Sequence, residues 1–155
     1  MSTPNIHHFF HSPTFTFAYV VSDSVTKQCV VIDSVLDYNQ AAARTSTGFA
    51  DEIIEYIEEH ELSLQWILET HAHADHLTAS HYLKEKLGGQ IGIGARISEV
   101  QEIFKGLYNL EDGFQADGSQ FDRLFKQGDV FSIGDLSCSI METPGHTPAC
   151  ITYIV

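Results

Sequence analysis

Short runs of apolar residues, separated by polar turn segments, divide the first third of the chain. β-Branched and aromatic residues dominate these runs, which predicts strands over residues 6–10, 14–21 and 28–33. The pattern then changes to a helical period, because Ile53, Ile54 and Ile57 recur on one helix face. Acidic residues surround these three, so we predict an amphipathic helix over residues 48–61 with a solvent-facing acidic side.

The middle of the chain alternates between strand and helix patterns. An apolar strand over residues 64–69 leads into a histidine-rich loop, and a helix over residues 77–87 follows and ends at two glycines. The remaining pattern predicts a strand over residues 90–94, a helix over 96–107, a polar segment over 109–128, and strands over 129–133, 136–142 and 149–155. This order favours an α/β layered fold, and without an internal repeat or linker we predict one domain over residues 1–155.

The charge of the chain narrows the classes of partner. Its 155 residues include 8 Lys and Arg against 21 Asp and Glu, a formal net charge of −13. Such a field repels polyphosphates and anionic lipids, so we expect neither a nucleic acid nor a membrane surface as partner. A bound divalent metal would still make its own site locally positive and able to hold an anionic ligand.

Cysteine usage and the amino-terminal segment indicate a compartment. Cys29, Cys138 and Cys150 are odd in number and lack the Cys-x-x-Cys spacing of disulfide frameworks or zinc ribbons. The first residues do not resemble a signal peptide, and apolar stretches are too short to cross a bilayer. We therefore expect a protein of the cytoplasm, which is a reducing compartment.

Three histidines and an aspartate occur within six residues, from His71 to His76. In an extended loop, alternate side chains point the same way, so His71, His73 and Asp75 would converge while His76 faces elsewhere. Imidazole and carboxylate groups are ligands for zinc, iron(II) and manganese, which makes this loop a candidate metal site. The alternative is a histidine-rich surface loop in which Asp75 only caps the following helix.

A second loop, Thr-Pro-Gly-His-Thr-Pro over residues 143–148, carries His146. Its prolines and glycine fix a tight turn directly after a strand, and such a turn can present one imidazole accurately. Alone it would be an ordinary turn, but together with the first loop it makes His146 a candidate ligand. We predict His71, His73 and His146 as metal ligands, with Asp75 and His76 as catalytic groups.

The motif Thr-His-x-His-x-Asp-His, followed by Pro-Gly-His-Thr, resembles the metallo-β-lactamase superfamily. Residues 67–80 and 143–153 look most like its persulfide dioxygenase branch, and the likeness extends through residues 9–16, 32–36 and 117–121. The resemblance implies an αββα sandwich built from two similar αβ halves. The chain resembles the first half, so we expect it to be truncated before the second.

The resemblance also implies an activity. Members of this branch are non-haem iron(II) enzymes that oxidise glutathione persulfide with dioxygen to sulfite and glutathione. By this likeness His71 and His146 are the two histidine ligands of the iron. His73, Asp75 and His76 are then groups that orient the ligands, order water and accept protons.

One part of the family pattern is missing from this sequence. The carboxylate ligand of the family lies on a Gly-Asp turn beyond the strand that follows Pro-Gly-His-Thr, and the sequence ends at Val155. The likeness therefore leaves the third iron ligand unassigned. It also implies an uncovered apolar sheet face, which predicts partner binding or self-association as a homo-oligomer.

Two other functions fit the same residues. In a glyoxalase II-type thioester hydrolase, His71, His73 and His146 would hold one metal, typically zinc, and Asp75 and His76 a second. A non-catalytic fragment that only binds metal is the other alternative, because a few loop histidines can take up zinc. The net charge counts against the nucleic-acid-processing members of the superfamily.

Overall fold

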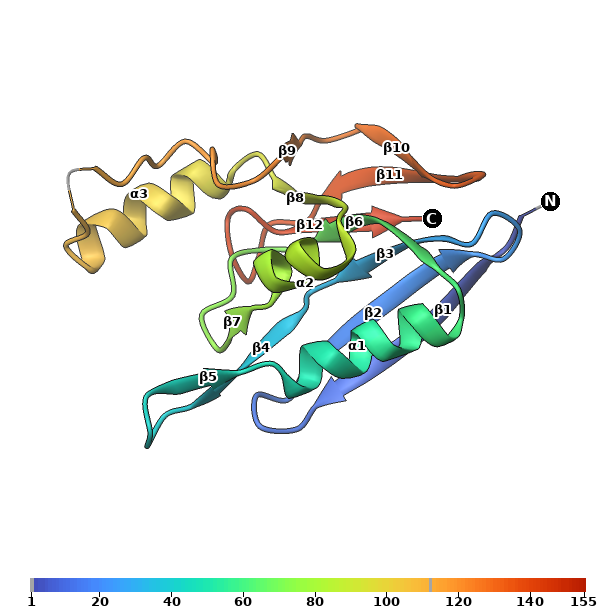
Figure 1. Cartoon of the computed structure of the whole chain (residues 1–155). Coiled ribbons are helices and arrows are strands. Elements are labelled where there is room, and N and C mark those ends of the chain that lie inside the picture. The colour runs from blue at the N-terminus through green and yellow to red at the C-terminus, as the bar shows by residue number, and fades with distance from the viewer. Residues whose placement is uncertain (1, 112) are drawn as a thin grey trace.

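A computed structural model describes residues 2–111 and 113–155, and its central element is a six-stranded mixed sheet (Figure 1). The first three strands are antiparallel, and the third to the sixth strand in the sheet are parallel. In spatial order, the strands are β1 (Pro4–His11), β2 (Thr16–Asp23), β3 (Gln28–Ile32), β6 (Ser63–Leu68), β8 (Gln90–Gly94) and β9 (Arg123–Phe125).

Two helices, α1 (Gly48–Glu59) and α2 (Ser80–Leu87), cover one face of this sheet. Ile53 and Ile57 of α1 are fully buried against Val31 and Ile67 of the sheet, as the helical spacing predicted. The predicted start of the next helix at residue 77 is wrong. Residues 77 and 78 form β7 (Leu77–Thr78), because the loop before them turns back to pair with β4 (Val35–Asn39).

A second sheet packs on the opposite face, so the layers run helix, sheet, sheet (Figure 1). It contains β10 (Val130–Ile133), β11 (Leu136–Glu142) and β12 (Ile151–Ile154), close to the predicted strands. Phe131 and Ile140 of this sheet are buried against Leu68 and Phe125 of the first. The α/β layered fold predicted from the sequence is confirmed.

Three smaller elements complete the fold. β5 (Arg44–Ser46) forms a hairpin with β4 that the sequence did not predict, and α3 (Ile97–Leu107) begins within one residue of its predicted start. β9 lies inside the segment that was predicted to be polar and irregular, so that prediction is wrong for residues 123–125. The sequence pattern does not predict this strand, because Asp122, Arg123 and Lys126 flank only two apolar residues.

The face of β1 and β2 that points away from α1 carries exposed aromatic side chains. Phe10, Phe17 and Tyr19 are 47%, 45% and 37% exposed, and the rings of Phe10 and Phe17 lie 4.8 Å apart. An exposed aromatic row of this kind agrees with the expected uncovered sheet face. A partner or a homo-oligomer at this face stays a prediction.

Asp23, at the end of β2, ties the two sheets together. Its buried carboxylate accepts hydrogen bonds from the Val25 N–H (2.9 Å) and the Thr26 hydroxyl (2.8 Å) of one turn. It also accepts from the Asp135 N–H (2.7 Å) in the turn between β10 and β11, and from the Ser2 hydroxyl. These bonds, that from Ser2 foremost, hold the pKa of the Asp23 carboxyl well below its usual range, although burial opposes them.

Replacing Asp23 by alanine should lower the melting temperature by roughly 5 °C or more at pH 7, because several donors lose one shared acceptor. Since folding lowers its pKa, the carboxylate stabilises the protein above pH ~4 and this contribution is lost as the pH falls further. Thermal denaturation should therefore show a larger difference in melting temperature between wild type and Asp23→Ala at pH 7 than at pH 3. Glu58→Ala, on the exposed side of α1, is the control. Equal melting temperatures of wild type and Asp23→Ala at pH 7 would contradict the prediction.

Candidate metal centre

The histidine-rich loop lies at the carboxyl edge of the parallel strands β3 and β6. Open α/β sheets place ligands at this edge, because loops from neighbouring strands meet there. The loop between β11 and β12 reaches the same edge, and Ile151 N–H donates a hydrogen bond to the Thr70 carbonyl (3.0 Å). This contact places the loop that carries His146 beside His71.

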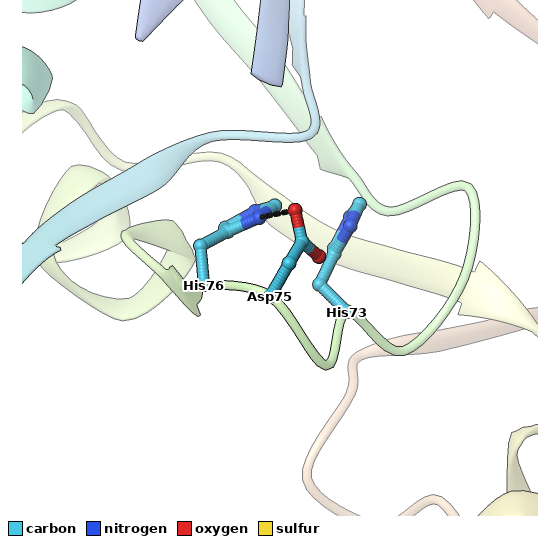
Figure 2. A group of neighbouring side chains, drawn as sticks. All are labelled: His73, Asp75 and His76. Carbon is cyan, nitrogen blue, oxygen red and sulfur yellow. Dashed lines mark hydrogen bonds and ion pairs between the residues drawn. The ribbon is translucent and has the colours of Figure 1, made fainter. Parts of the chain in front are cut away.

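Four imidazole rings gather at this point. The ring of His71 lies 4.1 Å from that of His73 and 4.9 Å from that of His146, between centroids. The His76 ring lies 4.2 Å from that of His73, with 36° between their planes. The prediction that His76 faces elsewhere is therefore wrong, because the loop folds back on itself instead of running extended (Figure 2).

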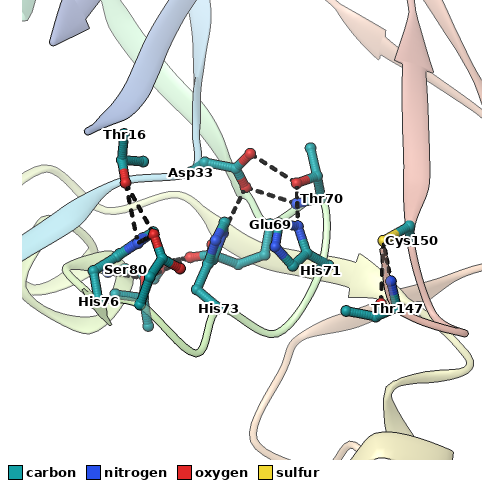
Figure 3. A network of polar contacts seen from close by, with 12 residues as sticks. Thr16, Asp33, Glu69, Thr70, His71, His73, His76, Ser80, Thr147 and Cys150 are labelled. Carbon is teal, nitrogen blue, oxygen red and sulfur yellow. Dashed lines mark hydrogen bonds and ion pairs between the residues drawn. The ribbon is translucent and has the colours of Figure 1, made fainter. Parts of the chain in front are cut away.

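Two buried carboxylates hold His73. Its Nε2 atom lies 3.1 Å from Oδ1 of Asp33, which follows β3, and 3.3 Å from Oε2 of Glu69, which follows β6 (Figure 3). Asp33 is itself fixed by the Thr70 N–H and hydroxyl, both at 2.7 Å. Nδ1 is therefore the ring nitrogen of His73 that remains available to a ligand.

The same network selects the nitrogen that His71 offers. The Thr70 hydroxyl donates its one hydrogen to Asp33, so at 2.9 Å from Nδ1 of His71 it acts as the acceptor. Nδ1 of His71 thus carries the proton and Nε2 keeps the lone pair that a metal requires. The tautomer is assigned from these hydrogen bonds.

Protonation differs among the imidazoles. Burial lowers the pKa of His71, and the neighbouring His73 lowers it further. His76 has a lowered pKa for the same two reasons. Burial also acts to lower the pKa of His73, but the hydrogen bonds and charges of Asp33 and Glu69 outweigh it and raise this pKa to about 10.

Asp75 and His76 form a separate pair. Asp75 Oδ2 accepts a hydrogen bond from the Thr16 hydroxyl (3.2 Å) and lies 3.3 Å from Nδ1 of His76. The Asp75 cap considered as an alternative is absent, because α2 begins after Ala79 and has no side-chain cap. His76 Nε2 is buried and has no hydrogen-bond partner among the described residues.

A hollow of about 370 Å³ opens between these groups and is bordered by His71, His73, Asp75 and His146. Two sets of ligand atoms in the described residues lie within 4.8 Å of one another: His73 with Asp75 and His76, and His73 with Asp33 and Glu69. The predicted ligands His71, His73 and His146 all border the hollow, but they are not one of these two close sets. The imidazole and carboxylate donors, together with the unpartnered His76 nitrogen, suit a zinc or iron(II) ion.

Asp33 and Glu69 were not predicted from the sequence as site residues. Both directly follow apolar strand segments, and such strand ends converge when the strands are parallel neighbours. Their position at strand ends was the signal in the sequence that could have identified them. It indicates a shared site only once β3 and β6 are known to be paired in parallel.

The family model described as "Metallo-beta-lactamase superfamily" matches residues 11–154. The chain belongs to this superfamily. The expected family and its layered fold are therefore confirmed, and its members are metal-dependent enzymes.

Several members of the superfamily are similar to this chain. It is 48% identical to a "Probable metallo-hydrolase" of Burkholderia pseudomallei, covering 95% of this chain and 50% of that protein. It is 51% identical to "Glyoxylase B2" of Dictyostelium discoideum, covering 88% and 47%. Human mitochondrial "Persulfide dioxygenase ETHE1" is 29% identical over 94% of this chain and 46% of its own length.

Among solved structures, ETHE1 from Myxococcus xanthus superposes with a TM-score of 0.71 and 26% identity, covering 97% of this chain and 53% of that one. The chain thus spans about half the length of the relatives it matches. In the described residues no helix has the length and apolar character needed to cross a membrane.

Replacing His71 or His146 by alanine should weaken binding of iron(II) or zinc by a factor of about 100 or more, because each removes a donor from the hollow. Elemental analysis of the loaded and desalted proteins measures this. His81→Ala is the matched control, because His81 is an exposed histidine on α2 that pairs with Glu85. Full metal content in either site variant would exclude that histidine as a ligand.

The stability of the metal-free protein should depend on pH through His73. Because folding raises its pKa from 6.5 to about 10, its contribution is complete below pH 6.5 and is lost as the pH rises toward 10. Urea denaturation of chelator-treated protein at pH 6.5, 8 and 9.5 should show this decline. His73→Gln should flatten it, and an unchanged slope in that variant would assign the effect to other groups.

Proposed function

We propose that this site oxidises a thiol-bound persulfide, such as glutathione persulfide, with dioxygen, using a single iron(II) ion. The proposal rests on one difference among the four imidazoles, namely which of them contact a carboxylate. His73 and His76 each contact carboxylates, whereas His71 and His146 contact none in the described part of the chain. Two histidines without carboxylate partners, facing one hollow, suit an iron site of two histidines and one carboxylate. Such a site leaves coordination positions open for substrate and oxygen.

The likeness to persulfide dioxygenases supports this assignment. The relative named for that activity matches 94% of this chain, and the Myxococcus xanthus ETHE1 structure shares its fold. By resemblance, a carboxylate from a later turn completes the iron ligands in that branch. Iron would supply the activation of dioxygen.

The residues of this chain would bind and orient the substrate. His71 Nε2 and an imidazole nitrogen of His146 would hold the metal at the hollow, and the neighbouring Asp75 could accept a proton from an incoming persulfide. A cavity of about 750 Å³ is lined by Asp75, Tyr38 and Tyr108, among other residues. This volume is ample for the body of a small thiol such as glutathione.

A second candidate function, hydrolysis of a thioester with two metals, is favoured by His76. Its Nε2 is buried and has no partner in the described part of the chain, while Nδ1 lies beside Asp75, as expected of a ligand for a second ion. The similarity to "Glyoxylase B2" points in the same direction. In this reaction a metal-activated water would attack the thioester.

Oxygen consumption separates the two reactions. The chain loaded anaerobically with iron(II) should bind one iron, and adding glutathione persulfide should cause oxygen uptake and sulfite formation. It should not hydrolyse S-lactoylglutathione. His146→Ala and the zinc-loaded protein are the controls and should consume no oxygen.

Two bound metals and thioester hydrolysis without oxygen uptake would refute the dioxygenase and support the hydrolase. Metal binding without either reaction would support the third alternative, a chain that binds metal but does not turn over substrate by itself.

A further inference from the structure

Glu69 is a buried charged residue that the sequence motif does not include. It directly follows β6, and its N–H donates a hydrogen bond to the Gly92 carbonyl of β8 (2.9 Å), so its backbone is part of the central sheet. Its side chain is only 3% exposed. A buried carboxylate is costly unless its oxygens are paired, so its contacts should explain its presence.

One carboxylate oxygen of Glu69 is anchored by two hydroxyl groups. Oε1 accepts hydrogen bonds from Thr78 of β7 (2.5 Å) and from Ser80 at the start of α2. The Thr78 hydroxyl in turn accepts from the Ser80 N–H at 3.0 Å. These contacts connect the metal loop to α2 and fix the plane of the carboxylate.

The other oxygen, Oε2, points at His73. It has no aligned hydrogen bond in the described residues, yet it lies 3.3 Å from Nε2 of His73, as an ion pair. Asp33 makes the aligned contact with the same nitrogen at 3.1 Å. Two carboxylates from neighbouring strands thus converge on one ring nitrogen, although one would be enough to pair with it.

We propose that Glu69 is a positioning residue of the metal centre: with Asp33 it clamps Nε2 of His73 and thereby directs Nδ1 of that ring into the hollow bordered by His71 and His146. A histidine near a metal needs such a partner to fix its ring orientation, and loss of the partner typically weakens metal binding by about 10- to 100-fold. The inference rests on the metal site of the proposed function, in which His71 and His146 hold the ion and His73 lies beside it as a group that orients the ligands; in the two-metal alternative His73 is itself a ligand. It does not depend on which reaction that site catalyses.

Glu69→Gln is the informative substitution because it keeps the shape of the side chain. The hydroxyls of Thr78 and Ser80 both donate, so they should retain the amide oxygen and leave the NH₂ group facing Nε2 of His73. An acceptor is thereby replaced by a donor at the contact that orients the ring. Glu85→Gln is the matched control, because Glu85 also pairs with a histidine, His81, but on the exposed surface of α2.

Titration of the metal-free chain with cobalt(II) provides a readout that is independent of turnover. The affinity and the visible spectrum of the bound cobalt are compared in wild type, Glu69→Gln, His73→Ala and the double variant. We expect Glu69→Gln to weaken binding about 10-fold and to alter the spectrum. In the His73→Ala background it should have less than about a 2-fold effect, because Glu69 acts through that ring.

Each other outcome overturns the proposal. Unchanged cobalt affinity and spectrum in Glu69→Gln would reduce Glu69 to an anchor for β7 and α2, which would alter only the melting temperature. An equal loss in the His73→Ala background would mean that Glu69 acts on another group. A wild-type chain that binds no cobalt would also refute it.

Thr78→Val keeps the test decisive if Glu69→Gln does not fold. This variant frees Oε1 of Glu69 from one anchor and should weaken cobalt binding in the same direction by about 3-fold. Failure of the dioxygenase proposal would look different, because oxygen uptake would then be absent in a wild-type chain that binds cobalt normally.

Discussion

The convergence of Asp33 and Glu69 on one nitrogen of His73 is the constraint on which the site depends. Each carboxylate follows a parallel strand, so the central sheet sets the distance between them. Burying both would be strongly unfavourable without partners. Thr70 and His73 of the loop pair with Asp33, whereas Glu69 is held by the hydroxyls of Thr78 and Ser80 and faces the same nitrogen of His73. This explains why residues 70–76 fold back over the strand ends. The resulting turn brings the three imidazoles of this short segment together with that of His146.

The same arrangement gives the site its affinity for a cation. Asp33, Glu69 and Asp75 bring three carboxylates to a cluster in which burial keeps His71 and His76 neutral near pH 7. Even with His73 protonated, the cluster has an excess of negative charge in a region of low dielectric. A divalent metal would neutralise this excess and, in a chain of net charge −13, create the local positive potential that the proposed anionic persulfide substrate would require.

Local patterns in the sequence predicted the elements that bury their own apolar face. The helix from Gly48 and the strands around β3, β6 and β11 agree with their predicted positions, whereas the β4–β5 hairpin, β7 and β9 depend on pairing with distant segments. The site follows the same rule. Its histidines could be found from their spacing, but the direction of His76 and the contact of Asp33, 40 residues from His73, depend on tertiary structure.

The environments of the imidazoles also explain why one motif can serve two chemistries. His71 is set by Thr70 to offer Nε2 in either reaction, and His73 is clamped through Nε2 in either reaction. The difference lies at His76, whose Nε2 is buried and unpartnered while Nδ1 faces Asp75. If that nitrogen held a second ion, the two metals would supply an activated water for hydrolysis. If it did not, a single metal would keep open positions for two small ligands. Between the two proposed reactions, the choice would therefore depend on whether this buried nitrogen binds a second ion.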